Sequence, residues 1–167
     1  MTEPLPSGWW TSAELQAWQE RYNLAPAQTG PADLGGVAWQ RCLASDLERT
    51  RVTALAVFAG EVEFTPLLRE AELSPFPTGR LRLPILVWRL LLQLAWMTGH
   101  RSQRAKRDDF RRRVVTIADR LCATREDVLV VSHAGLLAYL SAELRRRGFT
   151  GPRFRLARHA TAYVYKR

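Results

Sequence analysis

A short run of β-branched and leucine residues, followed by a serine and a histidine, indicates the fold class of this chain. Val128 to Val131 (VLVV) has the length and composition of a strand buried on both faces, as in a parallel sheet covered by helices. Ser132 and His133 follow it, and Gly135 with the leucine-rich stretch behind it predicts a tight turn that opens a helix. We therefore expect Ser132 and His133 at the carboxyl edge of a sheet, where open α/β sheets bind their ligands.

His133 has two interpretations at this point. The free N–H groups and the dipole of a helix amino end favour anions, so the histidine would face an anion site. Alternatively, it is a hydrogen-bonded structural histidine in an apolar setting. The stretch by itself favours neither.

The rest of the chain alternates between helical and strand patterns. Such alternation implies an α/β fold with a mainly parallel sheet flanked by helices, in one domain over residues 1–167. The patterns predict helices at about 11–23, 46–60, 84–97, 102–123 and from 135 onward, and strands at 37–45, 61–64, 128–131 and 160–167.

The net charge of +9 suits nucleic acid, an anionic membrane surface or phosphorylated substrates as partners, and charge alone does not choose among them. All basic residues but Lys106 and Lys166 are arginines. The most apolar segment, Leu83 to Gly99, is interrupted by Arg89 and Gln93 and is shorter than a membrane span. We expect it to be a buried or groove-lining helix, with no membrane span in the chain.

The cysteines and the amino-terminal sequence give information about the cellular compartment of the protein. Cys42 and Cys122 lie far apart and have neither zinc-ligand nor C-x-x-C spacing, so we interpret them as buried thiols. The first ten residues lack the apolar core of a secretory signal. These features predict a cytoplasmic protein, and we expect no metal and no cofactor.

Polar residues follow two predicted strands directly where helices begin, at Ser45 to Ala54 (SDLERTRVTA) and at Val131 to Gly135 (VSHAG). Between these motifs lies LLREAEL, which contains Glu70 and Glu72. An arginine, a histidine and a carboxyl group on one rim would suit phosphoryl transfer. Arginine binds phosphate oxygens bidentately, and a carboxylic acid protonates a leaving oxygen.

These motifs resemble those of the histidine phosphatase superfamily, whose fold is phosphoglycerate mutase-like. The pattern S-D-L-x-R-x-x-x-T-A matches Ser45 to Ala54 and implies that Arg49 grips phosphate, on an exposed rim. LLRE implies that Glu70 is the proton donor, with Glu72 as the less favoured substitute. VLVVSHAG assigns His133 to the phosphate pocket, where it would stabilise charge on the transferring group.

The resemblance departs from the family at the nucleophile. Family members begin with a strand that ends in Arg-His-Gly, whose histidine forms a phosphohistidine, and no such motif precedes the first predicted helix. Arg158 and His159 precede the last predicted strand, so they are not expected to supply it. Because the family commonly continues with any residue and then threonine, Met1 and Thr2 would directly follow the missing glycine. We expect an N-terminally incomplete domain without its first central strand, from a late start codon, a truncated gene or true loss.

Three functions follow from these motifs. The family implies phosphomonoester hydrolysis through a phosphohistidine, with the nucleophile absent from this chain as written. The alternative is an inactive pseudo-phosphatase that binds a phosphorylated small molecule or a phosphoprotein through Arg49 and His133. A nucleic-acid contact by the arginine-rich stretch Arg101 to Arg113 has no recognised motif or aromatic platform behind it, so we do not expect one.

Overall fold

The centre of the molecule is a three-stranded parallel sheet. The computed structural model describes residues 7–25, 30–154 and 160–167. Its main sheet has the order β3-β2-β5, formed by β2 (Arg41–Ser45), β3 (Val62–Thr65) and β5 (Val128–Val131). All residues of β2 after Arg41 are buried, as expected of a central strand with neighbours on both sides. The predicted α/β class with a mainly parallel sheet is confirmed.

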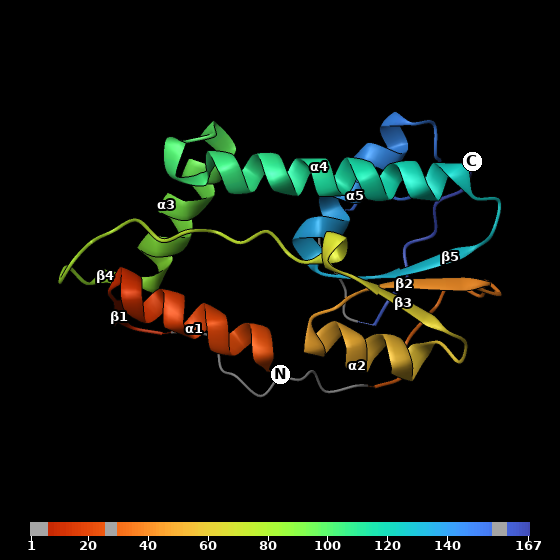
Figure 1. Cartoon of the computed structure of the whole chain (residues 1–167), viewed down its shortest axis with the longest axis horizontal. Helices are drawn as coiled ribbons and strands as arrows, with labels where there is room; N and C mark the ends of the chain where they lie inside the picture. The colour runs from red at the N-terminus through yellow and green to blue at the C-terminus, as the bar shows by residue number, and fades with distance from the viewer. Residues whose placement is uncertain (1–6, 26–29, 155–159) are drawn as a thin grey trace.

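Helices cover both faces of this sheet (Figure 1). One face packs against α2 (Glu48–Val57), and the other packs against α4 (Arg101–Ala123) and α5 (Ala134–Arg146). The larger core lies between the sheet, α4 and α5, and its fully buried side chains include Phe110, Ile117 and Leu136. Burial on both faces explains why β2 and β5 read as nearly continuous apolar runs.

A second, smaller layer lies beyond one end of the main sheet (Figure 1). It consists of α1 (Ser12–Leu24), α3 (Ile85–Thr98) and the antiparallel pair β1 (Trp9–Trp10) and β4 (Leu83–Pro84). Its core is built on Leu15, Trp88 and Leu92. The Trp88 indole also donates a 2.8 Å hydrogen bond to the carbonyl of Trp10, which ties α3 to β1.

The predicted helices and the first three predicted strands are present, with shifted ends. Thr11 caps α1 in a reciprocal capping box with Glu14, as the sequence indicates. The strand predicted over 37–45 begins only at Arg41, because its partners begin at Val62 and Val128. The helix predicted to reach residue 60 ends at residue 57, since the backbone is already extended at Phe58. No described helix combines the length and the hydropathy that spanning a bilayer requires.

The strand predicted at residues 160–167 is wrong. This segment makes only isolated bridges, from Thr161 to Asp33 and from Lys166 to Thr150. Side-chain contacts hold the segment in place of sheet pairing. The Tyr165 hydroxyl is hydrogen-bonded to the Ser141 hydroxyl and donates a hydrogen bond to the carbonyl of Pro152. Within the described part of the chain, β5 pairs with β2 on one edge and with no strand on the other.

The two cysteines are free thiols. Cys42 is buried in β2, as predicted, and burial raises the pKa of its thiol to about 11. Cys122, near the end of α4, is only partly buried, so the prediction for it is wrong in degree.

The amino end of α5 is capped from a distant part of the chain. The residue before this helix, His133, makes no side-chain cap. Glu70 follows the short 3-10 helix η1 (Pro66–Leu68), and its carboxylate accepts hydrogen bonds from the backbone N–H groups of Gly135 (3.0 Å) and Leu136 (3.1 Å). A carboxylate at this position satisfies donors that a helix leaves unpaired and complements its dipole.

Gly135 leaves space for the Glu70 carboxylate, and it does not form the tight turn that the sequence predicts. The predicted tight turn is absent, because Gly135 lies inside the first turn of α5 and outside the positive-φ region. A Cβ at this position would lie 2.6 Å from Oε1 of Glu70, which is closer than real Cβ atoms approach. The glycine therefore permits the Glu70 cap.

Gly135→Ala tests this packing through the sign of its effect. In an unhindered helix, alanine would raise the free energy of unfolding by up to about 1 kcal/mol. Here it should lower that free energy by about 1 kcal/mol, because the carboxylate must leave the helix end. Urea unfolding of the variant measures the sign. In a Glu70→Ala background the loss should disappear, and a loss of the same size there would contradict the account.

Candidate functional site

Parallel pairing brings the polar ends of β2 and β5 to one edge of the sheet. Ala44 lies opposite Val131, so Ser45 and the residues that follow β5 emerge together. The Ser132 hydroxyl donates a 2.7 Å hydrogen bond to the carbonyl of Leu68 and holds the turn after β5 in place. The residues between each strand and its helix therefore share one site.

His133 is buried at the centre of this site, with 8% of its surface exposed. Arg49 Nε donates to His133 Nδ1 at 3.3 Å, across 84 residues of sequence. Because a guanidinium has no acceptor, Nδ1 must accept, and the proton of the neutral ring lies on Nε2. That nitrogen lies 3.2 Å from Ser45 Oγ and 3.5 Å from Thr50 Oγ1.

The surroundings keep His133 neutral. Burial and, to a smaller extent, the positive charge of Arg49 together lower the pKa of His133 to about 4. The carboxylate of Asp46 opposes this shift. At neutral pH the ring is therefore an uncharged donor and acceptor beside a fixed positive charge.

Arg49 is half-buried, so the expectation of an exposed rim arginine is wrong. Its Nη1 donates to the carbonyl of Tyr22 at 3.1 Å and to Oδ1 of Asn23 at 3.4 Å, at the end of α1. The guanidinium also lies over the Tyr22 ring, 4.8 Å from its centroid. Burial lowers the pKa of Arg49, while the charges of Tyr22 and Glu70 oppose that shift. Removing this side chain would break its contacts to α1 and to His133.

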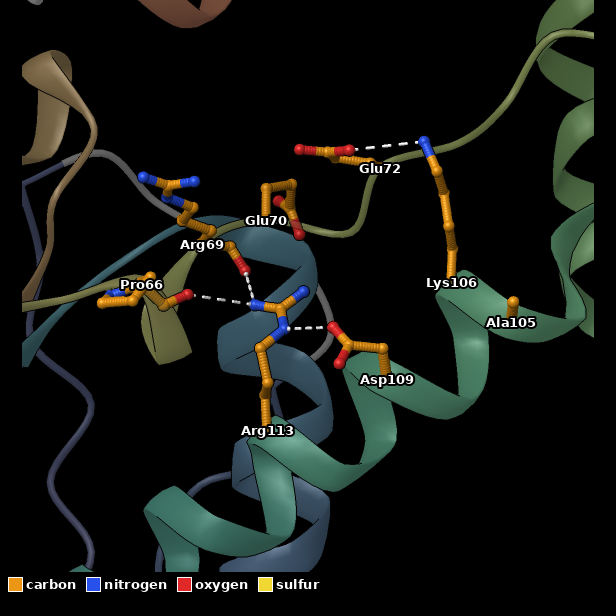
Figure 2. Close-up of a pocket in the computed structure, with 8 residues that line it drawn as sticks. All are labelled: Pro66, Arg69, Glu70, Glu72, Ala105, Lys106, Asp109 and Arg113. Atoms are coloured by element: carbon orange, nitrogen blue, oxygen red, sulfur yellow. Dashed lines mark hydrogen bonds and ion pairs between the residues drawn. The ribbon is translucent and has the colours of Figure 1, made fainter.

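The two candidate acids lie in different places. Glu70 contacts the helix that begins after His133 and interacts electrostatically with Arg49, but no hydrogen bond joins it to either residue. Glu72 is exposed and forms an ion pair with Lys106 at 3.3 Å, as Figure 2 shows. The structure therefore brings Arg49 and His133 into direct contact, places Glu70 beside them and places Glu72 farther along the chain.

Sequence reasoning missed an ion pair at the edge of the site. Arg69 forms a bidentate ion pair with Asp46. Its Nε donates to Oδ1 at 2.7 Å, and its Nη2 donates to Oδ2 at 2.6 Å. The hydrogen bonds from Arg69 lower the pKa of Asp46, and that carboxylate in turn raises the pKa of His133. Both residues stand inside the motifs that point to the site, one in SDL and one in LLRE. The hydrogen bond from Arg49 to the carbonyl of Tyr22 was also missed, because a backbone carbonyl leaves no motif in the sequence.

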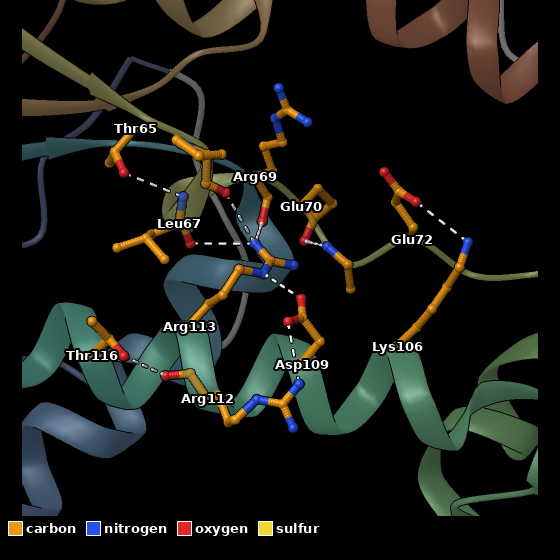
Figure 3. Close-up of polar contacts among 12 residues, drawn as sticks. Thr65, Leu67, Arg69, Glu70, Glu72, Lys106, Asp109, Arg112, Arg113 and Thr116 are labelled. Carbon is orange, nitrogen blue, oxygen red and sulfur yellow. Dashed lines mark hydrogen bonds and ion pairs between the residues drawn. The ribbon is translucent and has the colours of Figure 1, made fainter.

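A cleft of about 400 Å³ opens beside Glu70 (Figure 2). Arg113 of α4 is fixed in its wall by Asp109 and by the carbonyls of Arg69 and Leu67 (Figure 3). Ion pairs therefore neutralise much of the charge along the walls. The residues lining the cleft are Pro66, Arg69, Glu70, Glu72, Ala105, Lys106, Asp109 and Arg113.

The described ranges of the chain contain no group of three or more histidine, cysteine, aspartate or glutamate side chains placed to hold a metal ion. The polar groups of the site are instead a guanidinium, a neutral imidazole, hydroxyls and the amino end of a helix. These are donors suited to an anion.

Comparison with known proteins identifies the family. The crystal structure of "a putative alpha-ribazole-5'-P phosphatase" from Escherichia coli str. K-12 substr. MG1655 is similar at 26% sequence identity, with a TM-score of 0.43. The match covers 66% of this chain and 58% of the length of that chain. No curated protein matches this sequence. The family description "Histidine phosphatase superfamily (branch 1)" matches residues 24–166, nearly the whole sequence. On this match, the chain belongs to branch 1 of the histidine phosphatase superfamily.

Proposed function

We propose that this chain binds the phosphoryl group of a phosphorylated small molecule or phosphoprotein, with Arg49 and His133 as the binding residues. The observation that carries the proposal is the 3.3 Å hydrogen bond between these two side chains. They come from different strand-to-helix junctions and meet beside the amino end of α5. Their roles in the family are those of phosphate ligands, as the motifs imply.

Binding would exchange internal hydrogen bonds for bonds to phosphate. Without ligand, the donors of the site are satisfied by Tyr22, Asn23 and Glu70. A phosphate dianion would compete with the Glu70 carboxylate for the N–H groups of α5, where helix ends bind anions. Its negative charge would also raise the pKa of His133 and favour the imidazolium, which donates from both nitrogens.

Glu70 remains the proposed proton donor to a leaving oxygen. Support for this role comes from its place between the amino end of α5 and the cleft of Figure 2, which would hold the rest of the ligand. The carboxyl group would have to leave the N–H groups of α5 before it could act as an acid. Glu72 has less support, because its side chain is exposed and its carboxylate is paired with Lys106.

We further propose that the 167-residue chain binds without turnover. His133 is 8% exposed and both of its ring nitrogens have partners, so neither is aimed at an incoming phosphorus atom. His100 caps α4 on the surface, and His159 lies outside the described residues. The proposal is therefore a pseudo-phosphatase as the chain is written, built on a family that hydrolyses phosphomonoesters.

Anion binding predicts a shift in thermal stability. Phosphate, vanadate or tungstate should raise the Tm of the protein, by about 4 °C at roughly ten times the Kd, because the ligand binds only the folded state. Arg49→Ala should abolish this shift, and His133→Ala should weaken it. Arg49→Ala should also lower the Tm without ligand, since the side chain is half-buried and hydrogen-bonded. Differential scanning fluorimetry with and without anion separates the two effects.

Arg41→Ala is the matched control for Arg49→Ala. Arg41 lies at the opposite end of β2, where it pairs with Glu63 and Glu126 on the surface. This variant should keep the full anion shift. If no anion stabilises the folded wild type, or if the shift survives Arg49→Ala, the phosphate site is wrong and His133 is a structural histidine.

The absence of turnover is testable with an aryl phosphate. The 167-residue chain should hydrolyse p-nitrophenyl phosphate no faster than His133→Ala, because no described histidine is placed as a nucleophile. Turnover well above that variant, together with a trapped phosphohistidine, would show that the roles assigned to the histidines are wrong.

The buried state of His133 predicts a pH dependence of stability. Its folded pKa of about 4 lies below the ordinary value of about 6.5, so protonation favours the unfolded chain. This contribution is fully present above about pH 6.5 and is lost as the pH falls toward 4. Urea unfolding should give a free energy about 1 kcal/mol lower at pH 5.5 than at pH 7.5 from this residue.

The contribution of His133 is isolated by substitution. His133→Gln should flatten the pH profile between about pH 4 and 6.5, because the group with the lowered pKa is then absent. An unchanged profile in His133→Gln would contradict the assignment of a buried, neutral imidazole.

A further inference from the structure

The outer face of α3 is apolar and exposed. The sequence favours a buried or groove-lining helix here, but only one face packs inward, through Trp88, Leu92, Ala95 and Trp96. Twelve large hydrophobic side chains are exposed among the described residues, and half of them belong to this one helix. They are Leu86, Val87, Leu90, Leu91, Leu94 and Met97, between 38% and 71% exposed.

The sequence around α3 carries only positive charge. Between Glu72 and Asp108 there is no acidic residue and there are seven basic ones. Arg82 and Lys106 form ion pairs with acids outside this stretch. Four others are exposed and form no ion pair with any described residue; they are Arg80, Arg89, Arg101 and Arg104.

We propose that the outer face of α3 binds the surface of an anionic membrane, with the helix lying in the plane of the interface. Its apolar side chains would enter the boundary between headgroups and acyl chains, and the unpaired arginines would contact lipid phosphates. Trp9 (64% exposed) and Leu81 (60% exposed) add apolar surface near the amino end of the helix, where β1 pairs with β4. Tryptophan is favoured at the membrane–water interface because its ring is amphipathic.

Charge decides between lipid and a second copy of the chain. A symmetric contact through α3 would bring the same acid-free segment of both copies together, and neither copy would supply carboxylates for the unpaired arginines. An anionic lipid surface supplies phosphates to all of them. Binding to nucleic acid would use the arginines but would leave the row of exposed leucines without a role.

The location of α3 suits surface binding. The helix lies at the end of the molecule beyond the β3-β2-β5 sheet (Figure 1), and it packs against α4 on its inner side. Its exposed apolar face contributes nothing to the cores, so lipid contact requires no unfolding. The inference is independent of the phosphate site, because neither Arg49 nor His133 belongs to this surface.

Co-sedimentation with lipid vesicles tests the proposal. Wild-type protein should bind vesicles that contain about one-third phosphatidylglycerol about tenfold more tightly than pure phosphatidylcholine vesicles, and added salt should weaken this binding. The double variant Leu90→Gln/Leu94→Gln should bind about tenfold more weakly, because less apolar surface enters the interface. Arg80→Gln/Arg89→Gln should lose most of the preference for the anionic lipid.

Leu55→Gln and Arg145→Gln are the matched controls. Leu55 is 60% exposed on α2, and Arg145 is exposed near the end of α5, so both changes alter surface chemistry elsewhere. Both controls should bind vesicles as the wild type does, with an unchanged Tm. The proposal is overturned if wild type shows no preference for the anionic vesicles or if the α3 variants bind as wild type. It is also overturned if sedimentation equilibrium shows a dimer that Leu90→Gln/Leu94→Gln dissociates while vesicle binding is absent.

Discussion

The parallel pairing of β2 with β5 determines the geometry of the site. Its register sets Ala44 against Val131, so the residues that follow the two strands reach the same edge of the sheet. A shift of one residue would turn every side chain of a strand to the other face. Packing of both faces against α2, α4 and α5 opposes such a shift, because each side chain would have to fit a different set of close-packed neighbours. The contact between Arg49 and His133 follows from this arrangement.

In the unliganded site, the charged groups and hydrogen-bond donors have partners within the protein. Arg49 is held by the end of α1, His133 stays neutral beside it, and Glu70 covers the amino end of α5. Gly135 makes the last of these contacts possible by leaving space for the carboxylate. Each group would change partners if a phosphate entered. Such an exchange gains less free energy than binding to unpaired donors would, because each hydrogen bond to phosphate replaces one that must first be broken.

Local signals in the sequence predicted most of the fold. The residues VLVV gave the position of β5, and Thr11 with Glu14 marked the start of α1, because both patterns depend on near neighbours. The segment 160–167 is rich in strand formers but is fixed by the tertiary contacts of Tyr165, which no local pattern contains. The two-residue strands β1 and β4 are too short to leave a periodic signal.

The site was predicted in part for the same reason. Arg49 and His133 belong to recognisable sequence motifs. The parallel pairing of β2 with β5 explains why these two motifs lie side by side in the structure. The burial of Arg49 was missed, because it depends on the carbonyl of Tyr22 in a helix that sequence does not place beside α2. The apolar run of α3 was expected to be covered, yet sequence does not show which face of a nearly all-apolar helix meets the core.

Anion binding at Arg49 and His133 can be observed through the protonation state of His133. Nitrogen-15 NMR of the His100→Gln/His159→Gln variant would observe His133 as the only histidine of the chain. Without ligand, near neutral pH, the two ring nitrogens should show the neutral form with its proton on Nε2. Titration with phosphate should shift both signals toward those of an imidazolium, because the bound anion raises the pKa of the ring. Signals that stay unchanged at phosphate concentrations that stabilise the protein would show that the anion binds elsewhere.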